Sequence, residues 1–188
     1  GGVPLSQVQE AALMERVVLV RSSSYLFKGT VEENLKMAKP DATKEEIEAA
    51  LEKVNLLGFL ETQAGLQTQL LEKAGNLSGG QCQRLAIARA LLRKEASVYI
   101  FDEAASNIDV ESESLIMEVI HELAKTKTVL LISHRLANVV QSDKIYFLRE
   151  GEIQESGTHE ALMAAKGAYS RLFDSQMALE RYGKGGAA

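Results

Sequence analysis

The sequence predicts an α/β fold with a mostly parallel sheet, and two apolar runs and one glycine motif support this prediction. Residues 98–101 and Thr128–Ile132 are short, continuous apolar runs, which are typical of parallel strands buried on both faces. Polar residues follow both runs. Open α/β sheets bind ligands at the carboxyl ends of their strands, which is where these polar residues would lie. In residues 77–81, Leu-Ser-Gly-Gly-Gln, a serine and two glycines precede an apolar helix.

The first half of the chain predicts one more strand and one well-marked helix. Residues 6–16 are amphipathic, and residues 17–20 are expected to form a strand. Residues 43–54 predict a helix, because Thr43 and Glu46 form a capping-box pattern and apolar residues recur on one face.

The start of the helix after Leu77 is suited to bind an anion. Ser78 can cap this helix, because its hydroxyl can accept a hydrogen bond from a backbone N–H one turn further on. Gly79 and Gly80 leave the first amides uncovered, and the positive end of the helix dipole lies there, so a phosphate fits. The alternative is a capped, buried helix whose glycines only permit close packing, and the motif alone favours this alternative.

Carboxylates and a histidine follow the two predicted central strands. Asp102 is suited to hold magnesium, which usually takes one or two carboxylates together with phosphate oxygens, and Glu103 is placed to orient a water. The alternative for this pair is a helix cap followed by an acid in the first turn. His134 follows Thr128–Ile132, where a lone histidine is more often a capping or surface residue.

The last part of the chain predicts a helix, a hairpin and a helical end. A helix is expected over residues 111–125, a short one up to residue 141, and strands over 145–148 and 152–155 with a tight turn between them. From residue 157 a helical part begins, in which Tyr169, Leu172 and Phe173 are expected to pack inward. His159 is interpreted as structural. Residues 183–188 are expected to be a flexible tail after a domain that spans 1–182.

Composition argues against two classes of protein. The 188 residues carry a net charge of −5, which argues against a nucleic-acid binder, because such proteins need a basic surface. Cys82 is the single cysteine, so an internal disulfide is impossible and a reducing compartment fits. No apolar run approaches the roughly 20 residues that a membrane helix needs.

Together these motifs resemble the nucleotide-binding domain of ATP-binding-cassette (ABC) transporters. Residues 77–81 match the family's signature motif, and residues 98–103 match its Walker B strand with the glutamate that follows. Residues 106–109, Ser-Asn-Ile-Asp, are similar to its D-loop, and His134 to its switch histidine. The order and spacing of the motifs also agree, and the resemblance extends from about residue 3 to about residue 173.

The resemblance implies a P-loop NTPase-type sheet with a helical subdomain over about residues 29–92 that carries the signature motif. Two such domains would enclose two ATP molecules, each ATP held by the signature motif of one domain and the Walker A motif of the other. Ser78, Gly79, Gly80, Gln81 and Asp109 would contact ATP. Asp102 would support Mg²⁺, while Glu103 and His134 would serve hydrolysis.

Two departures from the family pattern affect this interpretation. The Walker A pattern G-x-x-x-x-G-K-[ST] does not occur in the sequence, so the phosphate cradle is missing and the fold is incomplete. Either this sequence begins downstream of that motif, which is favoured, or the protein lacks it. Ser22 stands where the family carries the Q-loop glutamine, and its shorter hydroxyl could reach a metal-bound water.

The expected function is ATP binding and hydrolysis in an exporter-type ABC transporter, at the cytoplasmic face of the membrane. Its partners would be a second nucleotide-binding domain and the transmembrane domains, with no nucleic acid. The chain alone is expected to be inactive. Two alternatives remain: a non-hydrolysing half of an asymmetric ABC dimer, and the signature half of a chromosome-maintenance ATPase.

Overall fold

The computed structural model describes residues 2–106 and 108–185, with side chains described as far as Leu179. These residues form two compact units, Gly1–Ile132 and Ser133–Ala188. Residues 1–182, expected to form one domain, therefore include parts of both units, and each unit is described by itself.

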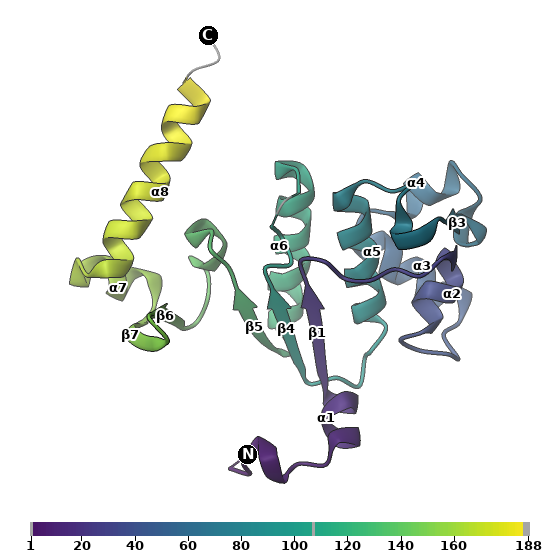
Figure 1. Ribbon diagram of the computed structural model, residues 1–188, viewed down its shortest axis with the longest axis horizontal. Helices are drawn as coiled ribbons and strands as arrows, with labels where there is room; N and C mark the ends of the chain where they lie inside the picture. Colours follow the sequence, from purple (N-terminus) through teal and green to yellow (C-terminus); the bar gives the residue numbers. More distant parts are fainter. Residues whose placement is uncertain (1, 107, 186–188) are drawn as a thin grey trace. The chain divides into compact units, whose positions relative to one another are not determined.

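The first unit contains a three-stranded parallel sheet with the strand order β1 (Val17–Arg21), β4 (Val98–Asp102), β5 (Thr128–Ile132) (Figure 1). Val98 pairs with both Val17 and Thr128, so the three carboxyl ends lie at one edge of the sheet. The predicted parallel sheet is therefore confirmed, and the residues expected to carry chemistry on β4 lie at its carboxyl end.

The two faces of this sheet differ in burial. One face, which includes Val20 and Phe101, packs into a core with residues of α5 (Gly79–Leu91) and α6 (Val110–Ala124). On the other face Leu19 and Leu130 are each 48% exposed and Ile132 is 45% exposed. The prediction that the strands are buried on both faces is therefore wrong here, because no described element of the first unit covers the second face.

A helical subdomain lies beside α5, on the side away from the sheet (Figure 1). Its elements are β2 (Gly29–Thr30), α2 (Val31–Lys36), α3 (Lys44–Lys53), α4 (Leu57–Glu61), 3₁₀ turns at Gly65–Gln67 and Glu72–Ala74, and β3 (Gln69–Leu70), which pairs with β2. The predicted helix is confirmed as α3, which Thr43 caps together with Glu46.

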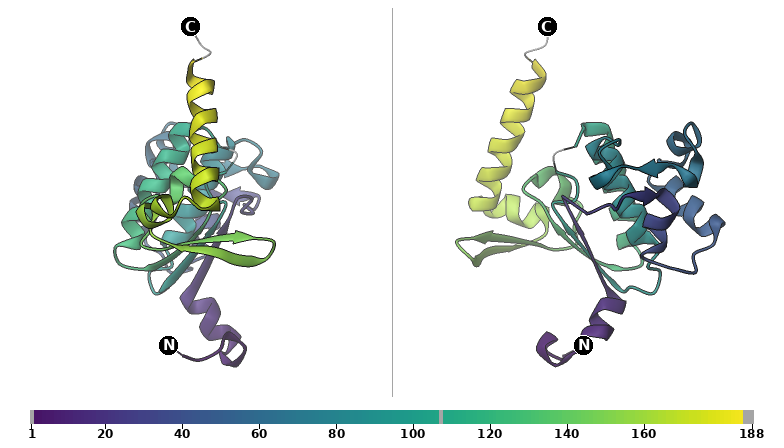
Figure 2. Two further views of the ribbon diagram at one scale, coloured as in Figure 1. Left: turned by 90° about the vertical axis from the view of Figure 1, so that its left-hand side faces the viewer. Right: turned by 45° about the vertical axis from the view of Figure 1, so that its right-hand side comes forward.

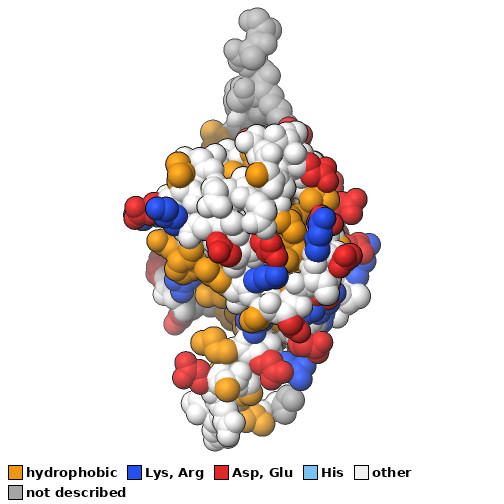
Figure 3. All heavy atoms as spheres, turned by 90° about the vertical axis from the view of Figure 1, so that its right-hand side faces the viewer, with side chains coloured by type: hydrophobic (Ala, Val, Ile, Leu, Met, Phe, Trp, Pro, Cys, Tyr) orange, Lys and Arg blue, Asp and Glu red, His pale blue; other side chains and the backbone are white. Residues whose placement is uncertain are grey.

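Buried apolar residues of α3, α4 and α5 join in one core with the sheet, so the signature helix is anchored on both sides. On the face of this subdomain that Figure 3 shows, acidic and basic side chains are interspersed with apolar ones. A 3₁₀ turn at Leu5–Gln7 and α1 (Glu10–Arg16) precede β1. Among the helices that the structure describes, none is both long and apolar enough to cross a bilayer.

The second unit is a hairpin followed by two helices. After a 3₁₀ turn at Leu136–Val139, β6 (Ile145–Arg149) pairs antiparallel with β7 (Glu152–Gly157), as predicted (Figure 2). The connecting Glu150 and Gly151 have φ values of 53° and 82°, which suit a tight hairpin turn.

Helices α7 (His159–Ala165) and α8 (Ala168–Gly185) complete this unit. Tyr169 is fully buried, but Leu172 is 42% exposed, so its expected inward packing is wrong. The reason is that Tyr169 and Phe173, four residues apart, share the face of α8 that meets His159, and Leu172 lies off that face. The backbone of α8 extends to Gly185. Residues 186–188 of the expected tail lie outside the described residues.

Candidate functional site

The signature motif forms the first turn of α5, and its serine is the predicted cap. Ser78 Oγ accepts from the Gln81 N–H at 3.2 Å, and Gln81 Oε1 accepts from the Ser78 N–H at 2.8 Å. This reciprocal capping box uses the side-chain oxygen of Gln81 and leaves its amide nitrogen for a ligand. The amides of Gly79 and Gly80 open the helix without carbonyl partners from a preceding turn.

Gly80 packs closely against the start of α6. A Cβ atom built on Gly80 would lie 2.5 Å from Ser112 Oγ and 3.0 Å from Asp109 Oδ2. Asp109 caps α6 by accepting from the Ser112 N–H at 2.8 Å, and hydrogen bonds from Ser112 lower the pKa of Asp109. The structure thus brings Asp109 together with the signature glycine.

The two residues predicted to serve a metal lie side by side at the carboxyl edge of the sheet. Asp102 ends β4, and the N–H of Ser22, which follows β1, donates to the Asp102 carbonyl at 3.0 Å. The Ser22 side chain is exposed. Backbone pairing therefore places a hydroxyl and a carboxylate at the same edge, where Mg²⁺ bound to phosphate could meet both.

Glu103, which follows Asp102, has an unusual backbone conformation. Its φ of 51° lies in the left-handed region, which costs a non-glycine residue on the order of 1–3 kcal/mol. Hydrogen bonds hold this conformation: the Glu103 N–H donates to the Ile132 carbonyl at 3.0 Å, and Ser106 donates to the Glu103 carbonyl. Strain of this kind gathers at functional sites, and the Glu103 side chain is exposed.

Gln83, one turn into α5, has a structural role that the sequence analysis missed. Its side chain is only 4% exposed, and its Nε2 donates to the Arg21 carbonyl at 3.0 Å. Arg21 ends β1 and precedes Ser22, so Gln83 links the signature helix to the sheet edge. The signal in the sequence that could have indicated this role was a glutamine in a largely apolar helix, because an amide that becomes buried needs a hydrogen-bond partner.

His134 lies in the second unit, in a segment that α8 supports. The carbonyl of His134 accepts from Gln176 Nε2 at 2.8 Å, and Gln176 Oε1 accepts from the Leu136 N–H at 2.9 Å. His159 contacts the hydroxyl of Tyr169 at 2.9 Å through Nδ1, which is consistent with the structural role expected for it. The amide side chain of Gln176 therefore bridges the backbone on both sides of Arg135 and helps to fix the segment that contains His134.

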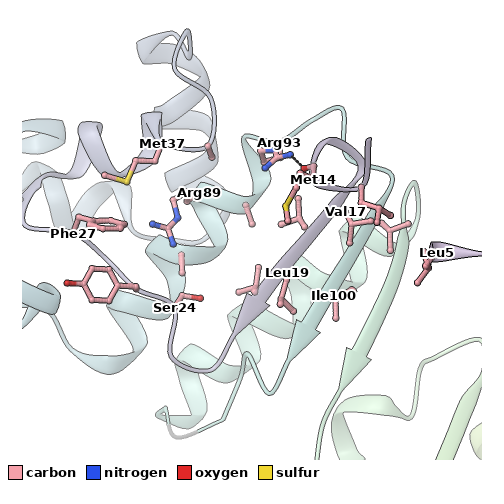
Figure 4. Close-up of a pocket in the computed structure, with 18 residues that line it drawn as sticks. Leu5, Met14, Val17, Leu19, Ser24, Phe27, Met37, Arg89, Arg93 and Ile100 are labelled. Atoms are coloured by element: carbon pink, nitrogen blue, oxygen red, sulfur yellow. Dashed lines mark hydrogen bonds between the residues drawn. The ribbon is translucent and has the colours of Figure 1, made fainter. Parts of the chain in front are cut away.

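An apolar hollow of about 960 Å³ lies between α5 and the uncovered part of the sheet (Figure 4). Leu19 and Ile100 of the sheet, Phe27 of the segment between β1 and β2, and Met37 at the end of α2 line it. Arg89 of α5 also lines the hollow, and its partial burial lowers the pKa of its guanidinium.

Cys82 lies in the first part of α5, where burial raises the pKa of its thiol.

The comparisons with known proteins agree on one family. The sequence model of the ABC transporter family matches residues 1–106. An ABC transporter ATP-binding protein of Haemophilus influenzae is 52% identical over 174 residues, which are 93% of this chain and 31% of that protein. An ATP-dependent lipid A-core flippase of Chromobacterium violaceum is 40% identical over 176 residues, 93% of this chain and 30% of the flippase.

A solved structure of a bacterial Atm1-family ABC exporter with ATP bound superimposes with a TM-score of 0.85 at 30% identity, over 92% of this chain and 30% of the exporter chain. The chain belongs to the ABC transporter family, and its fold is that of an exporter-type nucleotide-binding domain. The expected fold class and family are thereby confirmed. The chain spans about a third of the length of the relatives it matches.

Proposed function

We propose that the chain is part of the ATP-hydrolysing domain of an ABC exporter, which works with transmembrane domains and a second nucleotide-binding domain at the cytoplasmic face of the membrane. The observation that carries this proposal is the start of α5, where Ser78 caps the helix and Gly79 is exposed. Family membership and the carboxylates at the sheet edge support it.

The start of α5 fits the terminal phosphate of a nucleotide. Its donors are the first backbone amides, the Ser78 hydroxyl and the side-chain nitrogen of Gln81, and the helix dipole adds positive potential. The capping box fixes these groups before any ligand arrives. In the proposed dimer this surface holds a phosphate of the ATP that the partner domain binds, and Asp109 lies beside Gly80 at its margin.

The sheet edge fits the hydrolytic half of the reaction. Mg²⁺ supplies charge neutralisation on the phosphates, and Asp102 and the neighbouring Ser22 are the groups of this chain that would meet it. Glu103 orients the attacking water, and its charge stabilises the transition state. His134 donates a hydrogen bond to the terminal phosphate, which a neutral ring can do.

A second candidate is a non-hydrolysing half of an asymmetric dimer. Ser22 at the Q-loop position favours this candidate, whereas Glu103 and His134 fill both catalytic positions and favour hydrolysis. Turnover at the site formed by this domain separates the two.

The test uses the full-length protein that contains this domain. Glu103→Gln should abolish ATP turnover but retain ATP-driven association of the domains, because the amide keeps the shape and loses the charge. Ser78→Arg should prevent that association, because its bulk covers the helix start. Hydrolysis near the wild-type rate in Glu103→Gln would refute the catalytic assignment.

Two variants provide matched controls for this experiment. Thr43→Arg removes an equivalent capping box from α3, away from the proposed phosphate site, and should leave association intact. Glu111→Gln neutralises an exposed acid in the first turn of α6 and should leave turnover intact. Equal losses in Thr43→Arg and Ser78→Arg would show that capping, and not phosphate binding, explains the effect.

A further inference from the structure

Arg84 lies on α5, one turn after Gly80, and joins three elements that are far apart in the sequence. Its Nη1 donates to the carbonyl oxygen of Asn55 at 2.8 Å, and its Nε donates to the carbonyl oxygen of Gly80 at 3.4 Å. Its charge also acts on Asp109, the cap of α6. One guanidinium therefore joins the end of α3 to the first turn of α5, and its charge acts on the cap of α6.

The acceptor on α3 is held rigidly. Asn55 has a φ of 50°, in the left-handed region that asparagine tolerates better than most residues. Its N–H donates to the Glu52 carbonyl at 2.9 Å, and the N–H of Leu56 donates to the Leu51 carbonyl at 2.9 Å. These bonds fix the turn that ends α3, so a displacement of α3 also displaces the carbonyl that Arg84 binds.

The acceptor on α5 belongs to Gly80, which packs closely against the start of α6. Gly80 is buried and meets Ser112 and Asp109 so closely that a methyl group does not fit. Hydrogen bonds from Ser112 lower the pKa of Asp109 most, and the nearby charge of Arg84 lowers it further. The charge of Arg84 thus favours the ionised form of Asp109 at the start of α6, next to the close packing of Gly80 against Ser112.

We infer that Arg84 is a positioning residue that couples the helical subdomain to the phosphate-binding start of α5. This inference rests on the proposed function. Arg84 donates to the carbonyl groups of Gly80 and Asn55, so its role is to hold the helix start rather than to bind the phosphate. Removal of Arg84 should change the position of Gly80 relative to ATP. The partner domain should still provide most of the contacts that bind the nucleotide.

The chain offers a matched control just beyond the carboxyl end of α5. Arg93 also donates from its guanidinium to backbone carbonyls, those of Met14 and Glu15, but it lies after the carboxyl end of α5. Arg93→Met and Arg84→Met therefore remove the same charge and the same kind of hydrogen bond, one beyond the carboxyl end of α5 and one near its start.

The experiment measures kcat and KM for ATP in the full-length protein with Arg84→Met, Arg84→Lys or Arg93→Met. Arg84→Met should lower kcat about tenfold with KM changed less than about twofold, the pattern of an interaction that matters in the transition state. Arg84→Lys should recover part of the loss, because an ammonium keeps the charge near Asp109 but lacks the planar fork that reaches two carbonyls. Arg93→Met should keep the wild-type kcat.

Hydrogen exchange and thermal unfolding separate positioning from loss of folding. In Arg84→Met the amides of residues 78–81 and 109–112 should exchange faster, at an unfolding midpoint close to that of Arg93→Met. Equal kcat and KM values in Arg84→Met and Arg93→Met overturn the inference. A loss of kcat in proportion to the unfolded fraction, without faster hydrogen exchange at residues 78–81 and 109–112, also overturns it. A wild-type protein without ATP turnover overturns the proposed function, and with it the role inferred for Arg84.

Discussion

The carbonyl oxygen of Glu103 accepts two hydrogen bonds from Ser106, one from Oγ at 2.8 Å and one from the backbone N–H at 3.0 Å. The side chain of Ser106 is buried, while that of Glu103 is exposed. Two hydrogen bonds from the buried Ser106 thus hold the backbone of Glu103 in its strained conformation, with φ of 51°.

Replacing this serine tests whether the strained backbone matters for hydrolysis. Ser106→Ala removes the hydroxyl donor and keeps the backbone one, so the loss should be roughly 1 kcal/mol of positioning energy. We expect kcat for ATP to fall about fivefold, with nucleotide binding unchanged. Ser114→Ala, which loses a hydroxyl bond to the Val110 carbonyl on α6, is the control and should retain the wild-type kcat.

The close approach of Gly80 to α6 predicts a clear stability effect. Gly80→Ala places a methyl group 2.5 Å from Ser112 Oγ, so the unfolding free energy should fall by about 1–3 kcal/mol. Ser112→Gly in the same chain should restore part of this loss. Gly58→Ala is the control, because a Cβ there meets nothing within 4 Å; thermal unfolding that ranks the two variants equally would contradict the clash.

The ion pairs of Glu46 predict a pH dependence of stability. Glu46 binds Lys39 and Lys94, and these contacts, that with Lys39 first, lower the pKa of Glu46 from 4.5 to about 2. Because the pKa is lower in the folded state, this stabilisation is present above pH 4.5 and disappears as the pH falls towards 2. The difference in unfolding midpoint between wild type and Glu46→Gln should therefore shrink over that range.

The control for this pH experiment is Glu48→Gln on the same helix. Glu48 forms an exposed ion pair with Lys44 at 3.6 Å, so its removal should change the unfolding midpoint little. A difference between wild type and Glu46→Gln that stays constant from pH 6 to pH 2 would show that the Lys39 and Lys94 contacts do not set the stability contribution of Glu46.

The chain as given is expected not to bind ATP tightly or hydrolyse it. Its sequence contains no G-x-x-x-x-G-K-[ST] pattern, and that loop and its lysine supply most phosphate contacts in this class of enzyme. The start of α5 contributes only one side of the proposed phosphate site. Calorimetry of the 188-residue chain with Mg-ATP checks this, and a dissociation constant of micromolar order would reveal a further nucleotide site.

Much of the fold could be predicted because local chemistry determines it. Val17, Val98 and Thr128 begin strands that the apolar runs had marked, and Thr43 and Ser78 cap helices as their side chains suggest. The motif spacing indicated the family, and with it the residues of the candidate site. The capping bonds are made within a few residues, and the strands were recognised from short apolar runs even though their partners are distant in the sequence.

The remaining features depend on contacts between distant residues. The left-handed backbone of Glu103 is held by a bond to Ile132 of β5, and the bond from Gln83 to the Arg21 carbonyl joins α5 to β1. The exposure of Leu130 depends on what covers the sheet, which a strand's own apolar pattern does not specify. The bond from Arg84 to Asn55 likewise joins positions 29 residues apart through a backbone carbonyl that any residue type offers.

The pairing of β1 with β4 has a consequence during synthesis of the protein. Because the partner of Val17 lies about 80 residues later, a ribosome adding about 5–20 residues per second needs roughly 4–16 s to make it. During that interval the helical subdomain emerges while the apolar β1 lacks its pairing with β4. A chaperone that binds extended apolar segments would therefore meet residues 17–20 in the nascent chain, long before the sheet can form.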